Sequence, residues 1–352
     1  MNEIKQDEVI LGVDTHLDLH VGAVISSTGK LLGTLSASTD HKGYLQLLTW
    51  AKSFGYLRRA GVEGTGTYGA GLTRVLRDHD IDVSEVNRPD RAKRRLQGKS
   101  DPTDAESAAR AVLSGTATAI PKTQSGAAEA MRAVSVARRS AVKAKTQAIN
   151  QLRALLISSP QDVRERLWSV KPAECIERCV RLRSLGATTI LQTLTMTLRL
   201  MAKRWLALAE EIKELDAMLE KLTSKHAKRL REQFGIGPQT AAILVAVAGD
   251  NPERLKNEAA LAALCGVSPL QASSGKTTRH RLNRGGDRTA NNALWTIALV
   301  RMRSDPRTRA YVDRRSAQGM SRKEIHRCLK RYIVRALYPL IIADLADSAS
   351  ST

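Results

Sequence analysis

The chain has 352 residues, of which 42% are hydrophobic, so it is long enough for two globular domains with buried cores and is not a disordered protein. Its 56 Lys and Arg residues outnumber 35 Asp and Glu residues, and the resulting net charge of +21 indicates a polyanionic partner. Aromatic residues make up only 3% of the chain, which argues against single-strand binding by base stacking.

A membrane surface is the competing polyanion. The apolar runs at residues 241–248 and 340–343 are far shorter than the roughly 20 residues of a spanning helix. Residues 1–9 also lack the apolar region of a signal peptide. We therefore expect no membrane association and a cytoplasmic protein associated with the bacterial nucleoid.

Residues 1–120 have the pattern of a mixed α/β domain. Three short β-rich runs come first, at residues 9–13, 20–26 and 31–38. A helix, a strand, a second helix and a second strand follow, at residues 41–54, 59–63, 68–78 and 82–86. Three antiparallel strands followed by β-α-β units is the order of the RNase H fold, which we therefore predict.

Four carboxylates stand where a two-metal site would need them. Asp14 ends the first strand and Glu63 ends the fourth, while Asp101 and Asp104 begin a later helix and lie on one face of it. Such oxygen ligands hold two Mg²⁺ ions, or alternatively Mn²⁺, about 4 Å apart, where they clamp the attacking and leaving oxygens of a phosphodiester. The alternative for Asp101 and Asp104 is helix capping, with Pro102 at the first helical position.

A basic segment comes directly before the Asp101 pair. Its cationic residues are Arg88, Arg91, Lys93, Arg94, Arg95 and Lys99. A run of this kind is often only a solvated surface, but beside four acids it supplies counter-charge for a phosphate backbone. We therefore predict that the segment binds nucleic acid.

Residues 121–230 are predicted to be almost entirely helical. The helix at 127–158 is strongly basic, and we expect Arg138 and Arg139 on it to bind nucleic acid, a solvated basic face being the alternative. From Leu191 to Leu222, apolar residues keep the three-four spacing of a coiled coil. We expect this arm to join copies of the chain into a dimer or tetramer. The alternative is an antiparallel hairpin with the basic helix of the same chain.

The four cysteines are too few and too scattered for a disulfide framework, in keeping with a reducing compartment. Cys175 and Cys179 lie four residues apart on a predicted helix, but no second Cys or His pair nearby would complete a tetrahedral zinc site. We expect half-buried thiols.

Residues 231–345 are predicted to form a second helical domain, followed by a disordered tail at 346–352. The segment from Phe234 to Thr240 has the pattern of a helix-hairpin-helix element, in which Gly235 and Gly237 let backbone N–H groups approach a phosphate. A plain turn that uses glycine to stop a helix is the alternative.

The four acids and a second set of motifs near the C-terminus resemble the DEDD-motif transposases of insertion sequences, the IS110 family, which is related to Piv-type DNA invertases. That family has a Gly-x-x-Pro stretch, a Ser-Gly pair, a basic segment with a Gly-rich turn, and an Arg-led helix. The corresponding residues here are 266–269, 274–275, 276–287 and 288–295. The resemblance extends from Val9 to about Ala343.

The resemblance implies a RuvC-like N-terminal domain that uses the four acids, and it makes Ser274 the nucleophile, with the adjacent Ser273 as the alternative. A serine hydroxyl needs a base or a metal to activate it, and its attack would leave a 5′-phosphoserine link. The cationic residues expected to hold phosphate in this region are Lys276, Arg279, Arg281, Arg284 and Arg288.

The predicted function is that of a transposase or DNA recombinase. The resemblance implies donor and target double-stranded DNA as substrates and a structured noncoding bridge RNA that selects them. One alternative is a RuvC-like hydrolytic endonuclease of the junction-resolvase type, in which water replaces the serine. A second is a nucleic-acid binder without enzymatic activity.

Overall fold

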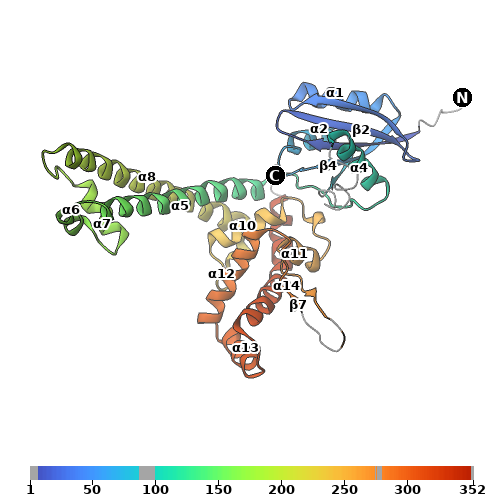
Figure 1. Ribbon diagram of the computed structural model, residues 1–352. Helices are drawn as coiled ribbons and strands as arrows, with labels where there is room; N and C mark the ends of the chain where they lie inside the picture. Colours follow the sequence, from blue (N-terminus) through green and yellow to red (C-terminus); the bar gives the residue numbers. More distant parts are fainter. Residues whose placement is uncertain (1–6, 87–99, 274, 276–279, 350–352) are drawn as a thin grey trace, which may run out of the picture. The chain divides into compact units, whose positions relative to one another are not determined.

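The computed structural model describes residues 7–86, 100–273, 275 and 280–349, and the chain divides into two compact units at residues 1–124 and 125–352 (Figure 1). No helix within these ranges is both long and apolar enough to cross a lipid bilayer.

The first unit is built on one sheet of five strands in the order β3-β2-β1-β4-β5. The strands are β1 (Glu8–Thr15), β2 (Leu19–Ser26), β3 (Leu31–Ser38), β4 (Tyr56–Glu63) and β5 (Asp82–Val86). β1, β2 and β3 pair antiparallel, whereas β4 and β5 extend the sheet in parallel from β1. The predicted mixed α/β domain is confirmed, and its strand order is the one expected for an RNase H fold.

Helices cover both faces of this sheet. They are α1 (His41–Lys52), α2 (Ala70–Asp78) and α4 (Asp101–Leu113). On β1, Leu11 packs in the core cluster that contains residues of α1 and α2, whereas Ile10 packs against Ala109 of α4. Because successive side chains of a strand point to opposite faces, Gly12 and Asp14 lie on the same face as Ile10 and are turned toward α4.

The second unit begins with a helical arm. Its helices are α5 (Ala127–Ile157), α6 (Gln161–Leu167), α7 (Pro172–Val180) and α8 (Thr189–His226). The two long helices α5 and α8 pack along each other, and α6 and α7 lie at the far end of the pair (Figure 1). A buried cluster that includes Leu152, Ile176 and Leu198 holds that end together.

The apolar seam predicted on α8 is used within the chain. Its members Leu198, Ile212 and Leu219 are buried, and Arg138 of α5 forms an ion pair with Asp216 of α8. The antiparallel hairpin that the sequence left open as an alternative is therefore the arrangement observed. Self-association through the arm would need another face of α8 and stays a prediction.

The rest of the second unit is a helical bundle with one small hairpin. Its elements are α9 (Lys228–Arg231), α10 (Pro238–Ala248), the 3-10 helix η1 (Pro252–Arg254), α11 (Glu258–Leu264), β6 (Leu270–Gln271), β7 (His280–Arg281), α12 (Arg288–Ser304), α13 (Pro306–Ala317) and α14 (Arg322–Ala349). α10 is buried along most of its length and forms the centre of the core. The predicted helical C-terminal region is confirmed.

The end of α14 corrects one expectation. We expected disorder from residue 346, but the helix continues through Ala349. The buried carboxylate of Asp344 accepts hydrogen bonds from the backbone N–H groups of Arg229 and Leu230, and Ser348 contacts the imidazole of His226. These contacts anchor the last turns of α14 to α8 and α9, which explains why they are ordered.

Candidate active site

The last residues of β1 and the first turn of α4 meet on one face of the sheet. Asp14, the penultimate residue of β1, and Asp104, in the first turn of α4, are both buried, with 6% and 8% exposure. Asp101 begins α4 and is partly exposed. Burial raises the pKa of Asp14 above its ordinary value, and the charges of Asp104 and Asp101 raise it further, whereas His16 lowers it. The structure therefore brings three of the four predicted acids together.

This grouping fits a divalent cation. Carboxylates held close together in a partly buried place repel one another, and a bound cation removes that repulsion. Carboxylate oxygens are also the donors that Mg²⁺ and Mn²⁺ accept.

Glu63 occupies the neighbouring strand end. The parallel register pairs Val13 of β1 with Val62 of β4. The next residues, Asp14 and Glu63, therefore lie at the same level on neighbouring strands. The hydroxyl of Thr15 donates a 2.8 Å hydrogen bond to the backbone carbonyl of Glu63. A Cβ on Gly61 would lie 2.7 Å from a backbone oxygen of α4, so Gly61 faces that helix. Glu63, two residues further on, belongs to the same face.

The capping alternative for Asp101 is not observed. Ser100 occupies the N-cap of α4, and its hydroxyl is paired with Thr103 at 2.7 Å. Asp101 and Pro102 form the first turn instead. The Asp101 carboxylate is thus available to the site beside β1.

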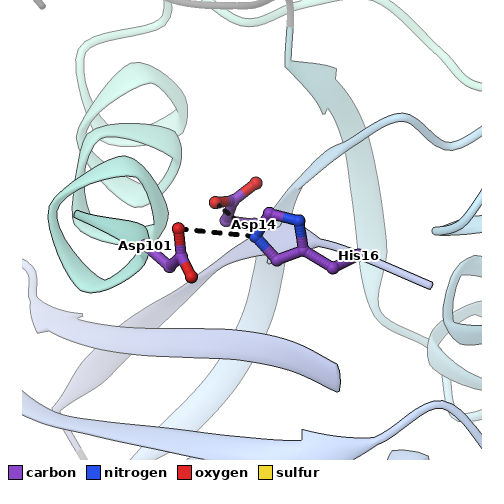
Figure 2. A group of neighbouring side chains, drawn as sticks. All are labelled: Asp14, His16 and Asp101. Atoms are coloured by element: carbon purple, nitrogen blue, oxygen red, sulfur yellow. Dashed lines mark ion pairs between the residues drawn. The ribbon is translucent and has the colours of Figure 1, made fainter. Parts of the chain in front are cut away.

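His16 also lies at the candidate site, although it was not predicted from the sequence. Its Nε2 atom lies 3.3 Å from Oδ2 of Asp14 and 3.5 Å from Oδ1 of Asp101, and Figure 2 shows both carboxylates near this ring nitrogen. Within the described part of the chain, Asp14, His16 and Asp101 form the one set of three His, Cys, Asp or Glu side chains whose ligand atoms lie within 4.8 Å of one another. The signal in the sequence was weak: His16 follows Asp14 by two residues, just beyond the end of β1.

In the second unit, two glycine motifs far apart in the sequence contact each other. A Cβ on Gly266 would lie 2.2 Å from the carbonyl oxygen of Gly285, and one on Gly286 would lie 2.4 Å from the backbone nitrogen of Gly266. The side-chain amide of Asn291 donates to the carbonyls of Cys265 and Gly266. This contact fixes the start of α12 against the segment that follows α11.

A basic pocket lies at this junction. It is lined by Leu282, Asn283, Arg284, Gly285, Arg288, Asn291, Asn292 and Trp295. Arg284 and Arg288 are exposed, as is Arg281, which lines an adjoining hollow. None of these three arginines forms an ion pair with an acid in the described ranges. The role predicted for them, phosphate binding, stays a prediction.

Several predicted residues lie outside the described residues. They are Arg88, Arg91, Lys93, Arg94, Arg95 and Lys99 of the basic segment, and Ser274, Lys276 and Arg279 of the C-terminal motif. The segment that contains Ser274 connects β6 to β7, which the sequence analysis did not predict as strands.

The two arginines predicted to bind nucleic acid from the basic helix lie in different surroundings. The side chain of Arg138 is only 18% exposed and is paired with Asp216, so it joins α5 to α8, and its contact with nucleic acid stays a prediction. Arg139 is exposed, and its Nη1 donates a 3.0 Å hydrogen bond to Thr289 in the first turn of α12. Arg139 thus lies against the first turn of α12, the helix that Arg288 begins.

The glycine-rich turn joins two helices of unequal length. Gly235 has a positive φ of 82°, which favours glycine, and Gly237 is the N-cap of α10 with open space around it. The helix before the turn, α9, has only four residues. A helix-hairpin-helix that binds DNA therefore stays a prediction.

The expectation of half-buried thiols is wrong for Cys175 and Cys179, which are fully buried in the apolar cluster at the end of the arm. All four cysteines are free, so none forms a disulfide.

Two parts of the chain match known protein families. Residues 227–313 match the family described as Transposase IS116/IS110/IS902 family, and residues 11–159 match a DEDD transposase family of the IS110 type, described as Transposase. The second match contains Asp14, Glu63, Asp101 and Asp104, and the first contains Ser274 and the basic pocket.

Curated relatives point the same way. An insertion element IS110 uncharacterized 43.6 kDa protein of Streptomyces coelicolor is 29% identical over 152 residues, and an insertion element IS900 uncharacterized 42 kDa protein of Mycobacterium paratuberculosis is 28% identical over 144 residues. The aligned segments cover 42% and 40% of this chain, and 37% and 36% of the relatives. The similarity thus spans little more than a third of each relative.

Proposed function

The chain belongs to the IS110 family of DEDD transposases, and from this premise we propose that it cuts and rejoins the DNA of its own insertion sequence. The observation that carries the proposal is the convergence of Asp14, Asp101 and Asp104 at the junction of β1 and α4, with Glu63 on the adjacent strand end.

The proposed role of the four acids is to hold divalent cations. Mg²⁺ or Mn²⁺ at this position supplies positive charge that stabilises the charge developing on a phosphodiester during cleavage. The buried position of Asp14 and Asp104 keeps water from screening that charge. α4 and β1 hold the carboxylates in place, so little reorganisation is needed when DNA binds.

The proposed nucleophile is Ser274. Its hydroxyl oxygen forms a bond to phosphorus, and the bond from phosphorus to the 3′-oxygen breaks. The serine proton is passed to a base, and the departing 3′-oxygen gains a proton to become a hydroxyl. The product is a 5′-phosphoserine link, and its reversal by a 3′-hydroxyl of another strand rejoins DNA without an external energy source.

The exposed arginines of the second unit are the proposed DNA contacts. Arg284 and Arg288 line the basic pocket, Arg281 lines the adjoining hollow, and Arg139 lies against the first turn of α12. A planar guanidinium group can donate two hydrogen bonds to one phosphate, so it orients the DNA backbone as well as attracting it. Gly235 and Gly237 are proposed to offer backbone N–H groups to the same backbone.

Two further partners belong to the proposal. A structured bridge RNA would select donor and target DNA, and the surplus of positive charge supports a second polyanion. A dimer or tetramer would hold donor and target DNA together for the exchange of strands.

Purification from cells that carry the element, followed by sequencing of the bound RNA, tests the proposed bridge RNA. One discrete RNA from the flank of the element supports guidance, whereas degraded cellular RNA argues against it.

Covalent trapping tests the central step. Incubation with element-end DNA and Mg²⁺ should yield a protein–DNA adduct that survives denaturation and disappears in Ser274→Ala. Ser273→Ala is the matched control and should still form the adduct. Unchanged cleavage by Ser274→Ala without any adduct in either protein would instead establish the hydrolytic endonuclease. An adduct that persists in Ser274→Ala and is lost in Ser273→Ala would identify Ser273 as the nucleophile. Unaltered activity of Asp14→Asn would exclude metal-dependent cleavage at these acids.

A further inference from the structure

His16 sits in the turn directly after β1, with its ring against the acids of the candidate active site. Its Nε2 atom lies 3.3 Å from the Asp14 carboxylate and 3.5 Å from the Asp101 carboxylate (Figure 2). The ring as a whole is partly exposed, but Nε2 is buried and makes no hydrogen bond of normal geometry. A buried nitrogen without such a bond is costly unless something else uses it.

The distances from Nε2 to the two carboxylates distinguish a hydrogen bond from shared binding of a cation. Charge-assisted hydrogen bonds from nitrogen to a carboxylate measure about 2.7–2.9 Å, which is shorter than both separations. Two atoms that bind one cation at about 2.0–2.2 Å lie about 2.8–3.6 Å apart, depending on the coordination geometry. The separations from His16 to both aspartates fall within the second range.

We propose that Nε2 of His16 binds the same divalent cation as Asp14 and Asp101, so that this site has a nitrogen ligand in addition to carboxylate oxygens. The inference rests on the proposed metal-dependent function and extends it to a residue that the four-acid motif does not include.

A nitrogen ligand changes which cation is favoured. Mg²⁺ prefers oxygen donors and keeps its water ligands, whereas imidazole suits transition-metal ions, among which Mn²⁺ accepts both nitrogen and oxygen. We therefore expect this position to bind Mn²⁺ more tightly than Mg²⁺. Loss of the imidazole should lower Mn²⁺ affinity by about tenfold or more, with a smaller effect on Mg²⁺.

The competing role for His16 is that of an ion-pair partner that positions the two aspartates without touching the cation. Both roles would reduce activity if the residue were replaced. They differ in whether nitrogen is bonded to the metal, and that difference is visible spectroscopically.

Pulsed electron paramagnetic resonance of the full-length protein loaded with Mn²⁺ provides the test. The wild-type protein should show electron spin echo modulation from a directly bound nitrogen. Labelling with ¹⁵N at histidine alone should change that modulation to the ¹⁵N pattern. His16→Asn should lose it while still binding Mn²⁺ more weakly, and the exposed His41→Asn is the matched control that should keep it.

The outcomes separate this inference from the proposed function. Mn²⁺ bound to the wild-type protein without histidine modulation, or modulation that persists in His16→Asn, overturns the role of His16 and leaves the acids as the metal site. Wild-type Mn²⁺ affinity in Asp14→Asn would overturn the metal site itself. The isotope experiment uses the native sequence, so the absence of histidine modulation overturns the inference even if a variant folds poorly, whereas His16→Asn assigns the modulation among the seven histidines.

Discussion

Gly12 of β1 lies directly against Ala105 of α4, and a Cβ atom added to Gly12 would lie 2.0 Å from the Ala105 carbonyl oxygen. The same atom would lie 2.3 Å from the backbone nitrogen of Ala109. The strand and the helix therefore touch through their backbones, which is possible only with glycine at this position. This close approach is what brings Asp14 within reach of the acids in the first turn of α4.

Gly12→Ala should therefore damage both the fold and the site. The methyl group would meet backbone atoms that cannot move aside, so we expect a loss of about 3 kcal/mol of stability, at the upper end for overpacking. Thermal unfolding and Mn²⁺ titration check this. Gly66→Ala is the control, since its Cβ would have no neighbour closer than 3.7 Å. If Gly12→Ala keeps the stability and metal affinity of the wild type, α4 can move away from β1 without loss of stability.

Asp14→Asn should stabilise the metal-free protein. Burial and the neighbouring carboxylates raise the pKa of Asp14, so its charged form is unfavourable in the folded state at neutral pH. In EDTA the variant should unfold at a higher temperature than the wild type. With Mg²⁺ or Mn²⁺ at 100 times the dissociation constant, the wild type should gain about 2.7 kcal/mol while the variant gains little. A variant that is less stable in EDTA would indicate that Asp14 has a structural partner.

The sheet and its acids could be predicted from the sequence because local patterns determine them. All five strands and the first two helices begin and end within three residues of the predicted positions. Alternating side chains identify the buried face of a strand, and acids at strand ends identify the edge of the sheet where a site forms, both without knowledge of the tertiary structure. The role of Gly12 was not predictable in this way, because it depends on a helix about 90 residues further along the chain.

For the arm, the sequence predicted the helix but not the partner against which it packs. The three-four spacing on α8 predicted a helix with one apolar face, which the structure contains. The spacing does not specify what covers that face, and α5 of the same chain does so here. His16 was missed for a related reason: a single histidine after a strand becomes informative only when Asp101 is known to lie opposite.

Arg138 and Asp216 should be coupled in stability. Arg138 is mostly buried and Asp216 is about half exposed, so we expect each alanine variant to lose about 1 kcal/mol. The double variant should lose about 0.5–1 kcal/mol less than the sum of the two. Urea unfolding of the four proteins measures this cycle. Strictly additive losses would mean that the ion pair contributes nothing to holding α5 against α8.

Glu258 should make the second unit sensitive to acid. A hydrogen bond from Arg331 lowers the pKa of Glu258 below its ordinary value of 4.5. A carboxyl whose folded-state pKa is lowered contributes stability above its unfolded pKa, and that stability is lost as the pH falls through the folded value. The stability difference between wild type and Glu258→Gln should thus be present at pH 7 and shrink below pH 4.5.

Thermal unfolding across this pH range checks the expectation. The control is Glu210→Gln, because Glu210 is 69% exposed beside Lys213 and should change stability little at any pH. A difference for Glu258→Gln that is constant with pH would contradict the assignment.

Arg288→Ala should weaken DNA binding in a way that depends on salt. Each phosphate contact releases counterions, so removing one contact lowers the slope of log affinity against log salt concentration by about 1. Arg284→Ala should act similarly, because both residues line the basic pocket. Titrations of double-stranded element-end DNA at several salt concentrations measure the slope.

The control for these titrations removes a charge of the same kind elsewhere. Arg181 is 78% exposed on the arm and pairs with Glu177, so Arg181→Ala changes the net charge equally without touching the pocket. Its slope should match that of the wild type. If Arg181→Ala and Arg288→Ala reduce the slope equally, the attraction comes from the overall charge and the pocket is not a phosphate site. A reduction confined to Arg284 and Arg288 assigns the pocket to the DNA backbone.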